Sequence, residues 1–252
     1  MTACASILIQ NSEDDNFQPV RANPVTIFPL GDSALTVEFG KQISAVLNQN
    51  AIALSDHFKQ NPFAGFVETV PAYASTTIFY DLIEVRESFP QFSTAYDAVK
   101  SFAENALKDL NKTGGDETRL IEIPVNFAGD YGPDLADVAK YANVTADEVV
   151  ELFTSETYRV FMLGFLPGFA YMGEVDERIA IPRHKTPRSK VAKGSVGIAG
   201  RQTGIYSLES PGGWQIIGRT DVGHFSPGSD PPCFLRPGDS VRFVDVRHSK
   251  VF

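Results

Sequence analysis

Seven basic residues lie in a stretch of the chain that contains no acidic residue. Between Arg178 and Leu208 there is no Asp or Glu, although the whole chain carries 22 Lys and Arg against 31 Asp and Glu, a formal charge of −9. The seven are Arg178, Arg183, Lys185, Arg188, Lys190, Lys193 and Arg201. Because a planar guanidinium pairs bidentately with carboxylate or phosphate groups, this segregation favours one cationic site for a small anion. The alternative is a solvated basic loop or a patch that docks on an acidic partner.

Four segments rich in glycine and proline accompany these cations. Residues 164–173 include three aromatic residues, which loops carry mainly when the rings are buried or form a pocket wall. In residues 182–188, two prolines hold two arginines on a chain biased toward extended geometry. Residues 194–204 and 210–220 are the other two segments. Tight corners of a small barrel explain most of the individual glycines, but they explain the arginines less well.

Several standard chemistries do not fit the sequence. The glycines after Gly194 match neither a dinucleotide-binding fingerprint nor a P-loop. The four histidines show no metal-ligand spacing, and no serine lies in a nucleophile elbow. The loop residue His224 is expected to be solvated, and Cys233, which follows two prolines, to be structural. No residue is therefore predicted as a nucleophile or general base.

Composition narrows the setting and the partners. The net acidity argues against nucleic acid or an anionic membrane as the main partner. No segment approaches the roughly 20 apolar residues that span a bilayer. Two cysteines cannot form a disulfide scaffold, which favours a reducing, cytoplasmic location.

The elements that must position these segments change in character near the middle of the chain. In the first half, strand signals at residues 25–39 and 66–80 alternate with helical periodicity at 42–60 and 93–111. This order predicts a sandwich in which helices cover one face of a sheet. The polar residues 111–117 then form the best linker candidate.

The second half has a different pattern. A strand at residues 120–125 and short helices at 133–142 and 146–153 come first, the latter helix with a capping box of Thr145 and Glu148. Short apolar runs between glycines and prolines follow and are typical of a closed barrel. The sequence therefore predicts an α+β fold, with a loose N-terminal tail (1–20), a small α/β sandwich domain (21–112) and a β-barrel domain (118–252).

In this order, the four segments resemble the signature of a known family, the B subunits of 5-oxoprolinase. The family is also labelled allophanate hydrolase subunit 1, or carboxyltransferase subdomain C and D, and includes the inhibitor of a sporulation histidine kinase. The resemblance spans roughly residues 24–245. It implies that the β-barrel is cyclophilin-like. It also implies an ATP-dependent hydrolase that opens 5-oxoproline to glutamate together with the A and C subunits, with ATP and Mg shared with those partners and no biotin attached to this chain.

The resemblance and the residues together give a hypothesis for the site. 5-Oxoproline carries a carboxylate and a lactam, which suit arginine clamps, a glutamine that bonds the lactam, and aromatic walls. The predicted substrate- and anion-binding residues are Arg183, Arg188, Arg219, Gln202, Ser195, Phe165, Tyr171, Tyr206 and Trp214, and the predicted backbone phosphate nest is Gly194, Gly197 and Gly200. Replacing Arg188 with Ala is expected to weaken turnover strongly and to leave the fold intact.

Two further points depend on the family. Similar sequences often carry a histidine where Phe153 stands, so an acid–base role at this position does not carry over to this chain. The alternative functions are inhibition of a sensor histidine kinase, which shares these motifs, and a subunit of urea or allophanate metabolism. Prolyl isomerase activity is suggested only by the barrel type and carries little weight.

Overall fold

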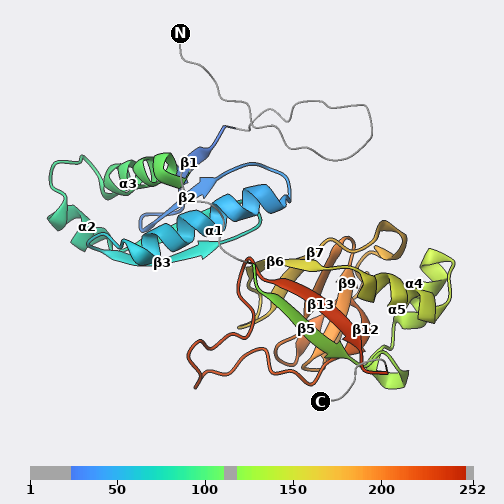
Figure 1. Ribbon diagram of the computed structural model, residues 1–252. Coiled ribbons are helices and arrows are strands. Elements are labelled where there is room, and N and C mark those ends of the chain that lie inside the picture. Colours follow the sequence, from blue (N-terminus) through green and yellow to red (C-terminus); the bar gives the residue numbers. More distant parts are fainter. Residues whose placement is uncertain (1–23, 111–117, 248–252) are drawn as a thin grey trace, which may run out of the picture.

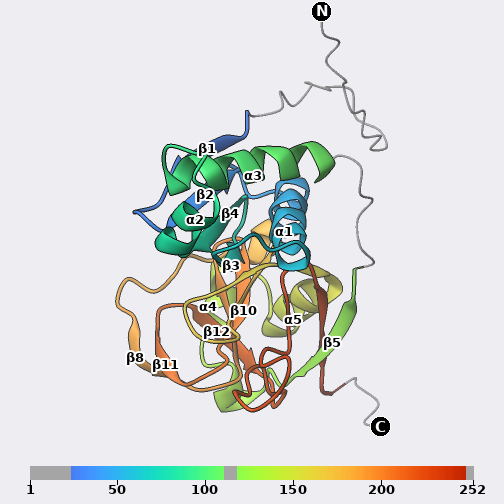
Figure 2. The same cartoon turned by 90° about the vertical axis from the view of Figure 1, so that its left-hand side faces the viewer.

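The computed structural model describes residues 24–110 and 118–247, so the predicted tail (1–20) and the linker candidate (111–117) lie outside the described residues. Figures 1 and 2 show two units, each with its own sheet. Each unit also has its own hydrophobic core. We call residues 24–110 the first unit and residues 118–247 the barrel unit.

The first unit is an antiparallel sheet of four strands in the order β1-β2-β4-β3. Its elements are β1 (Thr26–Pro29), β2 (Ala34–Glu38), α1 (Ala45–Gln60), β3 (Phe66–Pro71), β4 (Ser75–Tyr80), α2 (Leu82–Ser88) and α3 (Ala95–Leu110). Helix α1 packs on β3 and β4, while α3 packs on β2 and on α1, so both cover the same face. The α1 residues Ala51, Leu54 and Phe58 are buried there, because their spacing places them on one stripe.

The barrel unit is a sheet of seven strands in the order β12-β9-β10-β7-β6-β13-β5. Its strands are β5 (Leu120–Val125), β6 (Tyr158–Leu163), β7 (Ala170–Gly173), β9 (Ser195–Ala199), β10 (Gln202–Ile205), β12 (Gln215–Arg219) and β13 (Ser240–Asp245). Just beyond β5, Asn126 pairs with Arg219 at the end of β12, which brings the two edges together. The expected α+β fold with a barrel-like second half is therefore confirmed.

Smaller elements flank the barrel. They are the 3₁₀ turns η1 (Gly129–Tyr131) and η2 (Glu177–Ile179), the helices α4 (Leu135–Ala142) and α5 (Ala146–Ser155), and the two-stranded ribbon of β8 (Arg188–Val191) with β11 (Ser210–Gly212). The predicted capping box starts α5: Glu148 N–H donates to Thr145 Oγ1 at 3.2 Å, and Thr145 N–H donates to Glu148 Oε2 at 2.7 Å.

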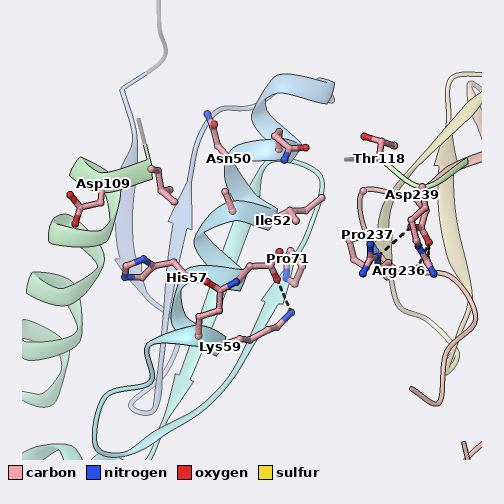
Figure 3. Close-up of a pocket in the computed structure, with 17 residues that line it drawn as sticks. Asn50, Ile52, His57, Lys59, Pro71, Asp109, Thr118, Arg236, Pro237 and Asp239 are labelled. Carbon is pink, nitrogen blue, oxygen red and sulfur yellow. Dashed lines mark hydrogen bonds and ion pairs between the residues drawn. The ribbon is translucent and has the colours of Figure 1, made fainter. Parts of the chain in front are cut away.

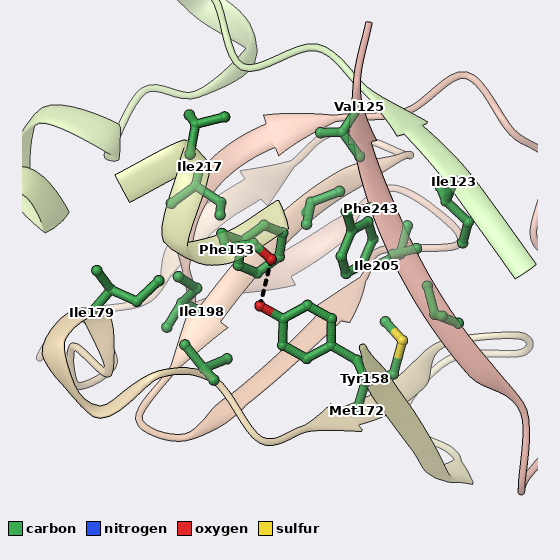
Figure 4. Packing of buried hydrophobic residues seen from close by; sticks show 14 of the residues in the cluster. Ile123, Val125, Phe153, Tyr158, Met172, Ile179, Ile198, Ile205, Ile217 and Phe243 are labelled. Atoms are coloured by element: carbon green, nitrogen blue, oxygen red, sulfur yellow. Dashed lines mark hydrogen bonds between the residues drawn. The ribbon is translucent and has the colours of Figure 1, made fainter. Parts of the chain in front are cut away.

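Phe153, on α5, belongs to the barrel core (Figure 4). It is fully buried, and its ring stacks on Phe243 with centroids 4.9 Å apart. The Tyr158 hydroxyl donates to the Phe153 carbonyl at 2.8 Å, so even this buried phenol has a partner. The position where similar sequences carry a histidine is thus a packing position in this chain.

Polar contacts join the first unit to the barrel unit. The side-chain amide of Asn48, on α1, is fully buried and donates to the carbonyls of Phe161 at 2.9 Å and Ala72 at 3.0 Å. Its oxygen accepts from Arg159 Nε at 2.9 Å, and Arg159 Nη2 donates to Gln49 Oε1 at 2.8 Å. These bonds satisfy polar groups that the junction removes from water.

None of the helices in the two described ranges is long and apolar enough to cross a bilayer. The cytoplasmic location stays a prediction.

Candidate functional site

The four predicted aromatic residues meet around Phe169. The Phe169 ring lies 4.8 Å from Tyr171, 5.3 Å from Tyr206, 5.4 Å from Trp214 and 5.6 Å from Phe165, measured between ring centroids. All four pairs are edge-to-face, which is a favourable arrangement for aromatic quadrupoles. We call these five residues the aromatic cluster. Phe165 lies at its rim with 62% of its surface exposed.

A glycine allows the 164–169 loop to fold onto the barrel. Gly168 has φ +74°, and a Cβ at this position would lie 2.6 Å from the His224 carbonyl oxygen. Any larger residue would therefore push the loop off its neighbour. The same loop is fixed by the Ser207 hydroxyl, which donates to the Pro167 carbonyl at 2.6 Å. Gly168 and the Ser207 hydrogen bond together hold the loop in the position that brings Phe165 and Phe169 into the aromatic cluster.

Arg183 is the predicted arginine that remains available at the cluster. Its guanidinium carbon lies 5.5 Å from the centroid of the Trp214 ring, in cation–π contact. The loop is held there because the His184 N–H donates to the Gly213 carbonyl at 2.7 Å. Within residues 24–110 and 118–247, no carboxylate lies within 4 Å of Arg183. Its charge is therefore free to bind an anion.

A residue that the sequence did not indicate completes the site. Tyr73, in the turn between β3 and β4, reaches the barrel, with its ring 6.3 Å from Tyr171 and 5.5 Å from Phe161. Gln202 Nε2 donates to the Tyr73 hydroxyl at 2.6 Å. Burial raises the pKa of Tyr73, the nearby Tyr171 raises it further, and Arg183 opposes this, so the hydroxyl stays neutral. No local pattern in the sequence could reveal this contact between two units.

Arg188 has a different position from the one predicted. It forms an ion pair with Asp134, whose side chain is only 3% exposed, and Asp134 also accepts the Ile216 N–H at 2.6 Å. His184 Nε2 lies 3.3 Å from the same carboxylate but not in hydrogen-bond geometry. Arg188 is thus committed to a buried acid, with a weaker 3.5 Å contact to the Trp214 carbonyl. The prediction that it clamps a ligand is corrected to an anchoring role.

The other cations of the acid-free stretch do not form one site either. Four of the seven pair with acids outside the stretch: Arg178 with Asp176, Arg188 with Asp134, Lys190 with Glu209, and Arg201 with Glu174 and Glu177. In the described part of the chain, ion-pair partners are absent for Arg183, Lys185 and Lys193. The expected single cationic site is wrong, because acids that border the stretch, together with the distant Asp134, neutralise most of it.

Arg219 contacts a ring outside the aromatic cluster. Its guanidinium carbon is 4.3 Å from the centroid of the Tyr131 ring, at the far end of β12 from Trp214. Ser195, which faces Arg219 across the β9–β12 pairing, is buried at 4% exposure. The Ser195 carbonyl accepts the Tyr206 N–H at 2.9 Å, so its backbone adjoins the aromatic cluster while its side chain is buried.

The predicted phosphate nest is not formed. Gly194 N–H donates to the Tyr206 carbonyl and Gly200 N–H to the Ile181 carbonyl, both at 2.7 Å. The two glycines flank β9, and Gly197 lies inside that strand, which pairs with β10 on one side and β12 on the other. Backbone N–H groups that already donate to carbonyls cannot cradle a phosphate. These residues do not fit ATP.

His224 is buried rather than solvated. Only 1% of its surface is exposed, its Nδ1 lies 2.7 Å from the Val222 carbonyl, and its Nε2 has no hydrogen-bond partner in the described residues. Burial lowers its pKa, and Lys193 adds to this effect, whereas the contact with Val222 opposes it. A glycine-flanked loop position gave no sign of this, because the burial comes from neighbours such as Phe234.

The class of this protein follows from comparison with known families. A family model described as "Carboxyltransferase domain, subdomain C and D" matches residues 25–235, and the chain belongs to this family. It is 43% identical over 218 residues to the B subunit of 5-oxoprolinase from Bacillus subtilis (strain 168), an alignment covering 86% of this chain and 91% of that protein. The family resemblance seen in the four segments is confirmed.

Two further comparisons agree. The B subunit of 5-oxoprolinase from Escherichia coli O157:H7 is 39% identical over 215 residues, covering 85% of this chain and 93% of that protein. The crystal structure of the protein TTHA0988 is 32% identical and superposes with a TM-score of 0.72, covering 87% of this chain and 41% of that longer chain.

Proposed function

We propose that this chain is the B component of an ATP-dependent 5-oxoprolinase, which opens 5-oxoproline to glutamate together with the A and C subunits. The similarity to proteins named as B subunits of 5-oxoprolinase, over most of both chains, supports this assignment. The activity belongs to the assembled complex, and this chain contributes one part of it.

The available guanidinium of Arg183 is the single observation that carries the proposal for the site. Cations beside an aromatic face and without a carboxylate partner are suited to a small anion. The carboxylate of 5-oxoproline pairs with Arg183, and its ring packs on the partly exposed Tyr171, next to the buried Trp214 that Arg183 contacts. This arrangement places the small substrate against a largely preformed wall.

Gln202 bonds the lactam in this proposal. Its Nε2 is held by the Tyr73 hydroxyl at 2.6 Å, which fixes the amide plane. The amide oxygen then faces away from Tyr73 and accepts from the lactam N–H of the substrate. Holding the ring at both its carboxylate and its lactam orients it for the reaction.

The nucleotide and its Mg are held by the partner subunits. Because the amides of Gly194 and Gly200 donate to carbonyls, no step on this chain is assigned to ATP. Activation of the amide by phosphoryl transfer is the chemistry that ATP supplies to the complex. This chain binds and orients 5-oxoproline.

Reconstitution by omission tests the function. The three purified proteins are combined with 5-oxoproline, ATP and Mg, and glutamate release is followed, with each one left out in turn. We expect release only when this chain is present together with the A and C subunits. Unchanged release without this chain would overturn the assignment, and tight binding to a histidine-kinase dimerisation domain with no release would favour the regulator.

A further inference from the structure

A second candidate site lies between the two units, at a distance from the aromatic cluster. A cleft of about 560 Å³ is lined by helix α1 and by the 236–239 turn of the barrel unit, and it shares no lining residue with the aromatic cluster. Figure 3 shows Asn50, Ile52 and His57 on the α1 wall, with Arg236 and Asp239 on the opposite wall. Its volume is in the range of sites for small molecules.

The barrel wall of this cleft carries two arginines that share one acid. Asp239 is 1% exposed and accepts from Arg119 Nε at 2.8 Å and from Arg119 Nη2 at 2.5 Å. Arg236 Nε lies 3.4 Å from the same carboxylate, and the Arg236 side chain is 63% exposed. Since one carboxylate cannot neutralise two guanidiniums, a positive charge is left on this wall.

A third guanidinium lies behind the wall. Arg159 donates only to neutral oxygens, those of Asn48 at 2.9 Å and Gln49 at 2.8 Å, and Gln49 itself lines the cleft. A Cβ added at Gly238 would come within 3.9 Å of Arg159 Nη2, so the guanidinium is directly beneath the turn. None of the carboxylates in the described residues lies within 4 Å of Arg159. Three guanidiniums therefore face one carboxylate.

The α1 wall does not compensate this charge where it faces the arginines. Its one acid–base pair, Asp56 with Lys59 at 3.4 Å, is internally neutral. Gln49, Asn50 and Gln60 add uncharged amides that can donate hydrogen bonds. The carboxylate of Asp109, on α3, also lines the cleft and offsets one positive charge of the barrel wall, so the excess positive charge comes from Arg159 behind that wall; His57 is the remaining titratable group of the lining.

We propose that this cleft binds a small molecule with two negative charges, a dicarboxylate or a phosphate ester, that holds the first unit against the barrel unit. The anion pairs with Arg236, whose side chain is mostly exposed, and accepts from the amides of α1, while Arg119 stays committed to Asp239. This inference does not rest on the proposed function, because it uses none of the residues assigned to 5-oxoproline.

Titration of the full-length protein with succinate and with inorganic phosphate tests the proposal. Thermal unfolding is followed at constant ionic strength, adjusted with chloride. We expect at least one anion to raise the Tm saturably, and Arg236→Gln to weaken that binding about tenfold or more, because a charge-assisted bond is lost. Arg242→Gln is the matched control: Arg242 pairs with Glu122 outside the cleft, so its loss leaves binding unchanged.

A steric variant separates the cleft from general charge effects. Ala53→Phe, on the α1 wall, fills the space and keeps every charge, so it also abolishes the saturable shift. If Ala53→Phe does not fold, Arg236→Lys is compared with Arg236→Gln instead. Tighter anion binding by Arg236→Lys supports the proposal, and equal binding by the two variants contradicts it. A response to only one anion supports the proposal and selects the ligand class. Equal shifts in all variants, or no shift in the wild type, overturn it.

Discussion

The Tyr73 hydroxyl of the first unit accepts a 2.6 Å hydrogen bond from Gln202 Nε2 of the barrel unit. Through this bond, a turn between two strands of one sheet becomes a wall of the site that the other sheet carries. The orientation of the two units therefore bears directly on the aromatic cluster, where Tyr73 also contacts Tyr171.

This bond predicts energetic coupling between the units. Tyr73→Phe and Gln202→Ala should each lower the free energy of unfolding, and a double-mutant cycle should give a coupling of about 1 kcal/mol, since each change removes the same hydrogen bond. Urea unfolding measures this. Tyr96→Phe is the control, because that hydroxyl bonds Ile27 within the first unit. Strict additivity of Tyr73→Phe and Gln202→Ala would show that the contact has no energetic role.

Because Arg188 pairs with the buried Asp134, we expect its replacement to lower the stability of the fold. Among the described residues, Arg188→Ala leaves the Asp134 carboxylate with only the Ile216 N–H as a hydrogen-bond donor. We expect a loss of about 1–3 kcal/mol in unfolding free energy, rather than an intact fold with weak turnover. Lys190→Ala, which breaks an exposed pair with Glu209, should cost about 1 kcal/mol or less. Equal stability of Arg188→Ala and the wild type in urea would contradict the anchoring role.

His224 makes the fold sensitive to acid. Its pKa is about 6.5 in the unfolded chain and is lowered by burial in the folded one. Between the two values the unfolded state binds more protons, so the unfolding free energy falls as the pH drops below about 7. His224→Gln should flatten this decline between pH 7.5 and pH 5 in urea unfolding. His57→Gln, on α1, is measured in parallel as a second histidine variant. An unaltered slope in His224→Gln would refute the prediction.

Because Phe153 is buried in the barrel core, we expect that a histidine at this position, as in similar sequences, destabilises the barrel unit. Phe153→His puts a polar ring among Phe243, Tyr158 and Phe127 with no room for water. The expected cost is about 3 kcal/mol or more of unfolding free energy, with no gain in glutamate release. Phe165→His, at the exposed rim, should cost far less in the same measurement. A stable Phe153→His variant with increased activity would show that the position belongs to a site.

Local signals in the sequence predict most of the elements. The strand at residues 120–125 and the helix-starting Thr145 have the predicted positions, because periodicity and capping depend on neighbours in the chain. Strand β7 lies where the sequence predicts a loop, since its residues 170–173 are placed by pairing with β6 and β10. Helix α2 is not among the predicted elements, although Asp81 caps it by accepting from two N–H groups.

The site could be predicted only in part, for the same reason. The aromatic residues converge because they come from segments that the barrel brings together, which their glycine and proline punctuation indicates. The sequence does not show in the same way which basic side chains remain without an acidic partner. Arg188 meets its acid 54 residues earlier in the chain, and Tyr73 meets Gln202 across 129 residues. Which cation stays available is decided by tertiary contacts, and only Arg183 combines availability with the aromatic cluster.

The most direct test compares two single-charge variants in the reconstituted three-protein complex. Steady-state glutamate release is measured over a range of 5-oxoproline concentrations for the wild type, Arg183→Ala and Lys185→Ala. Arg183→Ala should lower kcat/KM for 5-oxoproline about tenfold or more, because a charge-assisted bond to the carboxylate is lost, and Lys185→Ala should match the wild type. An Arg183→Ala complex with wild-type kcat/KM would contradict the assignment of this site.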